Sequence, residues 1–337
     1  MSDNPYRPPS DLPREHTDLP DVDSQTLAAR SLKPPVSLFA AALFGLAAAL
    51  LYTMANIALR YCVSVDPFLV SAVKAAPTLV GLAPFLLWMR WTGQTIATSY
   101  RIVPRFIVVS LIGQFVGNAA FQVALGVIGL AASVPITLGT LIIGGAVLGK
   151  LMLREPVRIR TIVAMLTLIA AVVVLSLPGA TVSPSESPSS LPLWVGALCA
   201  AASGMAYALF GVVVRQALTG GLSAPATMGL SGLIGTISLW SFCLVRMGVA
   251  EMMLVPEDAW LVMVAAGVFN FLAFVALSTS LKALPVVAVN LINASQVAMA
   301  AIAGVILFAE PITLPLISGI VLTFVGLAIL AHRRRET

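Results

Sequence analysis

Charged residues are scarce in this chain. Asp, Glu, Lys and Arg together make up 10% of its 337 residues, whereas 59% are hydrophobic. A soluble domain normally carries about a quarter charged residues. Apolar runs of roughly 20 residues recur from Val36 to Ala331, which is the length that a bilayer core requires. The composition excludes an ordinary soluble domain and predicts a polytopic membrane protein.

Cysteine and histidine are rare as well. The three cysteines, Cys62, Cys199 and Cys243, lie in or beside separate apolar runs without CxxC spacing, so neither a disulfide framework nor a zinc site is expected. The two histidines, His16 and His332, fall in polar tails. Because the apolar runs hold no histidine and no paired carboxylates, we expect no catalytic residue, no metal site and no cofactor. A membrane-embedded enzyme is therefore disfavoured.

The net charge of +5 raises the question of nucleic acid as a partner. The Lys and Arg residues lie between apolar runs rather than in one patch, and so no nucleic acid is expected. If the N-terminus is cytoplasmic, fourteen of them fall in inner segments, and only Arg60 and Arg246 fall in outer loops. This bias predicts an integral plasma (inner) membrane protein with the N- and C-termini cytoplasmic.

Charged residues, prolines and glycines divide the apolar sequence into ten expected spans of an all-α fold. The expected spans are 37–58, 67–89, 105–125, 130–152, 157–177, 192–214, 223–245, 259–279, 285–308 and 312–331. They predict five parts: a disordered cytoplasmic tail (1–35), a first five-helix repeat (36–178), a Ser/Pro-rich linker (179–191), a second five-helix repeat (192–331) and a basic cytoplasmic C-terminus (332–337).

A matched pair of segments suggests an internal duplication. The stretch "GKLMLREP" begins at Gly149, and "GVILFAEP" begins 155 residues later, at Gly304. The same offset maps Glu155 to Glu310, Pro156 to Pro311, Tyr52 to Tyr207 and Arg60 to Arg215. A constant offset predicts duplication of a five-helix unit. Because five is odd, the second copy enters the membrane from the opposite side, as in transporters with inverted repeats and a binding site near the midplane.

Two five-helix halves, each with a "G…EP" junction before its last helix, resemble the drug/metabolite transporter superfamily, specifically its EamA-like branch. The resemblance covers residues 37–331 and is clearest in "LKALPVVAVNLINASQVAMAAIAGVILFAEP". It implies inward- and outward-facing states around a central cavity, and export or exchange of small metabolites such as amino acids or amines. The expected partners are a small-molecule substrate and the lipid bilayer. Protons or a counter-substrate are candidates for coupling, and a homodimer is an open alternative.

Lys74 is the first candidate site residue, because it lies about eight residues, or roughly 12 Å, into the second expected span. A cation at such depth costs on the order of 2.5–3.5 kcal/mol and should face protein or water. Its ammonium could bind a substrate carboxylate or carry a coupling proton. Alternatively, its stem lies along apolar surface and its head bonds to carbonyls.

Amide and tyrosine side chains supply the other candidates for substrate binding. Most of them recur at three- or four-residue intervals, which place them on single helix faces, and Tyr207 is the counterpart of Tyr52 under the offset. They can line a cavity, or they can hold helices together by interhelical hydrogen bonds. The candidates are Tyr52, Asn56, Gln114, Asn118, Gln122, Tyr207, Asn270, Asn290, Asn293 and Gln296.

The Glu-Pro pairs allow two interpretations. Proline suits the first turn of a helix and a carboxylate suits its positive end, so each pair can simply begin a helix. The inversion suggests a further role, because Arg60 then shares the outer face with Glu310, and Arg215 shares the inner face with Glu155. We hypothesise that these pairs are gating latches which break and form alternately.

The sequence thus predicts a secondary transporter, an exporter or exchanger that moves small amphipathic metabolites by alternating access. A nucleotide-sugar or sugar-phosphate antiporter of the same superfamily is the alternative within transport. One central lysine is a small counter-charge for such substrates. A non-transporting receptor or scaffold remains the alternative outside transport, although it would not explain an inverted duplication.

Overall fold

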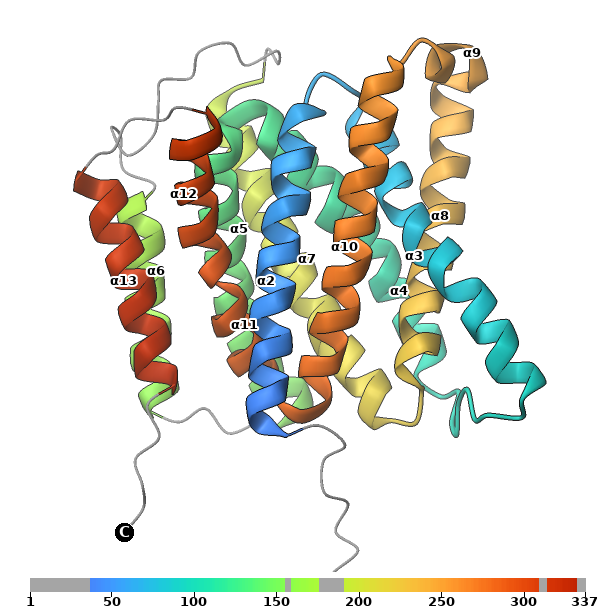
Figure 1. Cartoon of the computed structure of the whole chain (residues 1–337), viewed down its shortest axis with the longest axis horizontal. Coiled ribbons are helices and arrows are strands. Elements are labelled where there is room, and N and C mark those ends of the chain that lie inside the picture. The colour runs from blue at the N-terminus through green and yellow to red at the C-terminus, as the bar shows by residue number, and fades with distance from the viewer. Residues whose placement is uncertain (1–36, 155–158, 176–190, 309–313, 332–337) are drawn as a thin grey trace, which may run out of the picture. The chain divides into compact units, whose positions relative to one another are not determined.

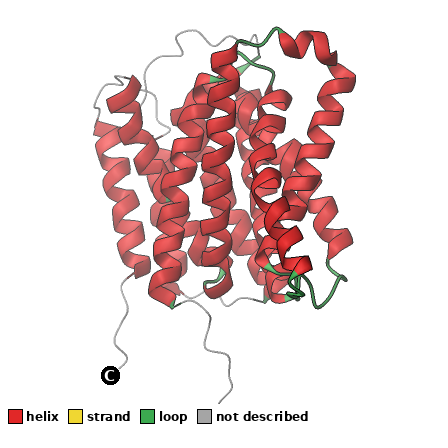
Figure 2. Cartoon of the chain, turned by 45° about the vertical axis from the view of Figure 1, so that its right-hand side comes forward, coloured by secondary structure: helices red, strands yellow, loops and turns green. Residues whose placement is uncertain are grey.

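The computed structural model describes residues 37–154, 159–175, 191–308 and 314–331, and these form a helical bundle (Figure 1). The helices are α2 (Leu38–Tyr61), α3 (Pro67–Trp91), α4 (Val103–Ile112), η1 (Gly113–Ala119), α5 (Ala120–Leu153), α6 (Ile159–Leu175), α7 (Leu193–Thr219), α8 (Ala224–Arg246), α9 (Gly248–Met253), α10 (Glu257–Ala283), α11 (Val286–Asn293), α12 (Ser295–Phe308) and α13 (Leu314–Ala331). Within these ranges the only β-structure is an isolated bridge between Ala97 and Leu222, which confirms the all-α class (Figure 2).

Some sequence predictions fall outside the described residues. These are the tail at 1–35, nearly all of the linker at 179–191, the C-terminus at 332–337 and both Glu-Pro pairs.

Seven helical segments of the described chain are long and apolar enough to cross a membrane. They are Leu38–Tyr61, Pro67–Trp91, Val103–Leu130, Ser133–Leu153, Trp194–Thr219, Ala224–Arg246 and Glu257–Ala283. Shorter apolar stretches occupy Ile162–Ala171, Val286–Ala300 and Ile317–Gly326. These helices identify an integral membrane protein, whereas the count of ten spans stays a prediction.

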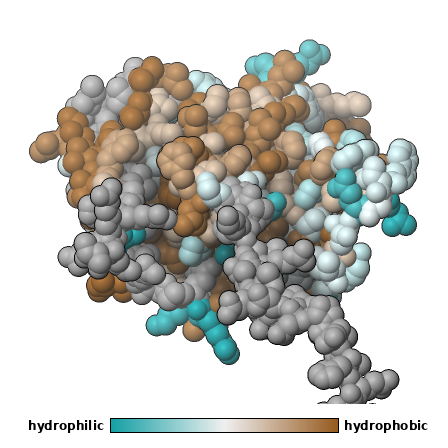
Figure 3. All heavy atoms as spheres, turned by 60° about the horizontal axis from the view of Figure 1, so that its bottom comes forward, coloured by the Kyte–Doolittle hydropathy of each residue, from teal (hydrophilic) through white to brown (hydrophobic). Residues whose placement is uncertain are grey.

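The described helices expose large apolar side chains. Phe39 is 75% exposed, Val80 70% and Leu151 72%. Figure 3 shows apolar residues, in brown, over much of the surface that it presents. Such side chains are expected where lipid rather than water surrounds the helices.

Local sequence explains where several helices begin and change course. Asp66 caps α3 by accepting hydrogen bonds from the backbone N–H groups of Phe68 (3.0 Å) and Leu69 (3.2 Å), and Pro67 occupies the first turn. Gly129 adopts φ 75° and ψ 177° and interrupts α5. An L-residue rarely adopts this φ, and so the glycine separates the expected spans 105–125 and 130–152.

Four helix pairs make the most extensive contacts of the described bundle: α2 with α10, α3 with α8, α5 with α7, and α6 with α13. Each pair combines one helix from residues 37–175 with one from residues 191–331. The two parts of the sequence are therefore interleaved rather than folded as separate units.

The pair of α3 and α8 is joined at both of its ends. At one end, Arg246 forms an ion pair with Asp66 and lies over the rings of Phe68 and Phe242, at 5.2 and 5.9 Å from their centroids. At the other end, the loops that follow α3 and precede α8 pair through their backbones. The Thr98 N–H donates to the Gly221 carbonyl (2.8 Å), and the Ser223 N–H donates to the Ile96 carbonyl (3.0 Å).

Candidate functional site

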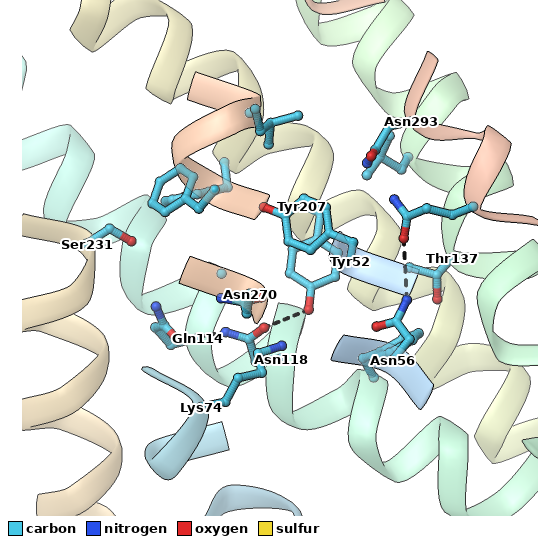
Figure 4. Close-up of a pocket in the computed structure, with 18 of the residues that line it drawn as sticks. Tyr52, Asn56, Lys74, Gln114, Asn118, Thr137, Tyr207, Ser231, Asn270 and Asn293 are labelled. Carbon is cyan, nitrogen blue, oxygen red and sulfur yellow. Dashed lines mark hydrogen bonds between the residues drawn. The ribbon is translucent and has the colours of Figure 1, made fainter. Parts of the chain in front are cut away.

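A cavity of about 160 Å³ lies within the bundle. Elements from both parts of the sequence contribute to its wall: α2, α3, η1 and α5 from the first, and α7, α8, α10, α11 and α12 from the second. Figure 4 shows polar side chains from several of these elements pointing into the cavity. A cavity among transmembrane-capable helices, with polar groups in a largely apolar wall, can hold a small solute away from lipid.

The structure places ten of the eleven sequence-predicted binding candidates in the wall of this cavity. They are Tyr52, Asn56, Lys74, Gln114, Asn118, Tyr207, Asn270, Asn290, Asn293 and Gln296. Contact with a substrate is still a prediction for each of them. Their common location nevertheless favours cavity lining over packing between helices as the reason for their placement.

Gln122 is the candidate that lies outside the cavity wall. Its side-chain amide donates to the carbonyls of Leu59 (3.2 Å) and Cys62 (3.4 Å), at the end of α2. The sequence interpretation assumed an α-helix with one face at i, i+4 and i+8. The residues Gly113–Ala119 instead form a π-helix, whose wider turn changes the angular positions along the helix. The helix face that includes Gln114 and Asn118 therefore does not continue to Gln122.

Lys74 is 6% exposed and contributes to the cavity wall from the middle of α3. Figure 4 shows its side chain pointing toward the cavity. No hydrogen bond or ion pair joins its ammonium group to another described residue. The described structure thus favours a cation presented to the cavity over an ammonium bonded to backbone carbonyls.

A chain of hydrogen bonds runs from α7 to the π-helix. The Tyr207 hydroxyl donates to Asn118 Oδ1 (2.7 Å), and Asn118 Nδ2 donates to Gln114 Oε1 (2.7 Å) (Figure 4). Ser203, one turn before Tyr207, donates to the Gly117 carbonyl (2.7 Å). The side chains of α7 therefore help to stabilise the irregular turn that carries the two amides.

Further amides line the opposite part of the wall. Asn56 Nδ2 donates to Gln296 Oε1 (3.4 Å), which joins α2 to α12. Asn290 Nδ2 and Asn293 Oδ1 are buried and have no hydrogen-bond partner within the described residues. Buried polar atoms of this kind are normally satisfied by protein, water or ligand.

The two proposed latch arginines bond to backbone carbonyls. Arg60 Nη1 donates to Leu125 O (3.3 Å), and Arg215 Nη1 donates to Leu281 O. Both proposed partners, Glu155 and Glu310, lie outside the described residues. The latches stay a prediction.

The structure adds residues to the wall that the sequence interpretation did not select. Thr78, Thr137 and Ser231 supply hydroxyl groups, and Phe121 and Phe210 supply aromatic surface. Thr78 could have been found, because it lies one helical turn after Lys74. Single hydroxyl and aromatic residues in apolar helices are too common for the others to be selected from sequence.

The second part of the chain matches a known protein family. Residues 194–331 match the EamA-like transporter family. This segment runs from the start of α7 to the end of α13, and the match confirms the resemblance for these residues, whereas for residues 37–193 it stays a prediction. The EamA-like segment contributes Tyr207, Asn270 and the α11–α12 amides to the wall, whereas Lys74 and the π-helix lie outside the matched residues.

A solved crystal structure, described only as that of a protein, has a similar fold. It superposes with a TM-score of 0.65 at 19% sequence identity, and the match covers 88% of this chain and 97% of that chain. At this identity the likeness concerns the fold alone. No curated protein matches the chain at a significant level.

Proposed function

We propose that this protein is a secondary transporter of the plasma membrane, an exporter or exchanger that moves small amphipathic metabolites by alternating access. The observation that carries the proposal is the cavity with polar side chains in its wall, to which helices from both parts of the sequence contribute. The EamA-like match over residues 194–331 supports transport as the activity.

The proposed architecture is two five-helix repeats of opposite orientation. A shift of 155 residues carries 38–61 onto 193–216, where α7 spans Leu193–Thr219, and carries 67–91 onto 222–246, where α8 spans Ala224–Arg246. The same shift carries 159–175 onto 314–330, where α13 spans Leu314–Ala331. An offset first noted at isolated residues thus also relates whole helices, as duplication requires.

Helix packing supports the same proposal. Under this shift α2 corresponds to α7, and the segment from α4 to the start of α5 corresponds to α10. If a twofold axis relates the two halves, the contact between α2 and α10 should recur between α7 and the segment that corresponds to α10. The helix α7 does contact η1 and α5 in this way. In Figure 1, α2 begins at the lower end of the bundle and α7 at the upper end, which favours inversion.

The cavity favours a small substrate. An internal cavity of about 150 Å³ accommodates benzene, whereas pockets for drug-sized ligands measure about 300–1,000 Å³. The volume of about 160 Å³ suits a metabolite of one ring or a short chain better than a nucleotide sugar.

Gly211 offers a direct test of the cavity. It lines the cavity on α7, and a Cβ atom there would meet nothing within 4 Å. Gly211→Leu should therefore fill the cavity without straining the helix. In proteoliposomes screened with amino acids, amines and organic acids, with and without a pH gradient, we expect wild-type flux of at least one solute and a loss of roughly tenfold or more in the variant.

Gly126→Leu is the matched control. Gly126 is also helical, a Cβ atom there also meets nothing within 4 Å, and it does not line the cavity. We expect wild-type flux from this variant. Equal flux from wild type and Gly211→Leu would remove the cavity from the transport path, and absence of flux for every solute would contradict transport.

A further inference from the structure

The cavity wall has an unbalanced charge. Among the described residues that form it, Lys74 carries the one formal charge, and no Asp, Glu, Arg or His joins it. The acidic residues in the described part of the chain, Asp66, Glu251, Glu257 and Asp258, lie at helix ends or in the short α9. A bound cation would therefore meet one positive charge and no carboxylate in this wall.

Burial makes the single positive charge of Lys74 energetically costly. Lys74 is 6% exposed, and no described residue pairs with its ammonium group. Removing a charge from water without a partner is costly, and an anion that enters the site offsets this cost. An anionic ligand is therefore bound more favourably in this cavity than a neutral ligand of the same shape.

The amides of the π-helix add hydrogen-bond donors to the same wall. In the chain from Tyr207 to Gln114, both amide oxygens already accept hydrogen bonds. Gln114 Nε2 at the end of the chain donates to no described residue. In the view of Figure 4, Lys74, Gln114 and Asn118 gather at one side of the cavity. An ammonium group and free amide N–H donors together suit the two oxygens of a carboxylate.

The rest of the wall suits an apolar body of limited size. Phe121, Phe210, Phe274, Leu138 and Leu277 provide aromatic and aliphatic surface. The volume of about 160 Å³ is close to that of a cavity which accommodates benzene. The ligand that uses the whole site thus combines one anionic group with a hydrocarbon part of about one ring.

We propose that the cavity selects monocarboxylate anions with a compact apolar body, and that Lys74 is the residue that determines this selectivity. The inference rests on the proposed function and narrows its substrates from amino acids and amines to organic anions. A zwitterionic amino acid fits less well, because its ammonium group would lie beside Lys74 without a carboxylate in the described wall. An amine is excluded by the same repulsion.

Binding to the full-length protein in nanodiscs tests the proposal. Four probes share one ring and differ in their polar group: phenylacetate, phenylacetamide, phenylalanine and phenylethylamine. Binding is measured rather than flux, because protonated phenylacetic acid crosses lipid unaided. We expect phenylacetate to bind most tightly and phenylethylamine least tightly. Lys74→Met should raise the Kd for phenylacetate roughly tenfold or more and leave that for phenylacetamide unchanged.

Two further variants make the test specific. Lys74→Glu should reverse the order, so that phenylethylamine binds more tightly than phenylacetate. Lys150→Met removes the same charge from an exposed position in the last turn of α5 and should bind all four probes as wild type does. Folding of each variant is checked by its elution as a single species and by binding of phenylacetamide.

The outcomes separate this inference from the proposed function. Preference for phenylalanine or phenylethylamine, or an unchanged phenylacetate Kd in Lys74→Met, overturns the selectivity and leaves transport standing. Flux of other solutes without binding of phenylacetate would likewise overturn the selectivity and leave transport standing. Tight phenylacetate binding without flux of any solute supports the selectivity and overturns transport.

Discussion

The helices α3 and α8 lie against each other and correspond under the 155-residue shift, yet they contribute different things to the molecule. From α3 come Lys74 and Thr78 in the cavity wall. From α8, at the position that matches Lys74, comes Gly229, followed by Gly232 and Gly235 at three-residue intervals. The helix α3 gives an ammonium group and a hydroxyl to the wall, whereas α8 gives one hydroxyl, from Ser231, and the glycines that leave room for α3.

The glycines of α8 show how close this approach is. A Cβ atom on Gly232 would lie 3.0 Å from the backbone nitrogen of Leu79, and one on Gly229 would lie 2.5 Å from Cδ1 of Leu86, both in α3. Small residues at such contacts let helix backbones approach closely in membranes. Under the proposed duplication, the position of Lys74 and Gly229 has diverged, in one copy toward the cavity and in the other toward close packing.

Gly232→Val should have the largest effect on stability. The added side chain meets the backbone of α3, which cannot move aside as a flexible side chain can. We expect a loss of about 3 kcal/mol in the free energy of unfolding, measured by thermal or denaturant unfolding in detergent. Gly126→Val, where a Cβ atom meets nothing within 4 Å, is the control. Equal stability of the two variants would contradict close packing at Gly232.

Lys74→Met, on α3, should change stability by a smaller amount and in the opposite direction. The substitution keeps most of the side-chain volume and removes a buried cation that has no partner among the described residues. We expect the ligand-free protein to become more stable by about 2 kcal/mol. Unfolding midpoints in detergent, with Lys150→Met as the reference, measure the difference. A lower midpoint than wild type would mean that Lys74 stabilises the fold.

Asp66→Asn should have the smallest effect. Asparagine retains the cap of α3 but loses the charge that pairs with Arg246, whose side chain is 44% exposed. Ion pairs this accessible contribute little, so we expect a loss below about 1 kcal/mol. Asp66→Ala removes the cap as well and should cost about 1 kcal/mol more. If both substitutions destabilise equally, the ion pair rather than the cap carries the contribution of Asp66.

Much of this architecture follows from patterns that are local in the sequence. Apolar length predicted the main helices, and the Asp66-Pro67 pair and Gly129 mark boundaries by capping and backbone geometry. Lys74 could be selected as a site residue because a cation in an apolar run needs a polar environment. Its place in the cavity wall is what that requirement implies.

Other features depend on contacts that no single segment encodes. The π-helix at Gly113–Ala119 is stabilised partly by Ser203 of α7, and its changed register removes Gln122 from the cavity wall. An α-helical periodicity rule cannot anticipate this change. The backbone pairing of residues 96–98 with 221–223 likewise joins two loops with no distinctive pattern in either.

The Asp66–Arg246 ion pair and the backbone pairing of residues 96–98 with 221–223 hold the two ends of the α3–α8 pair together, and this restricts how the molecule can rearrange. Contacts at both ends of the pair oppose separation of α3 from α8, although Pro77 and Pro84 interrupt the hydrogen bonding within α3. In the alternating access proposed above, we therefore expect the two helices to move together against their neighbours. Spin labels placed on the two helices test this expectation, which is a constant spacing between them while the spacing to other helices changes.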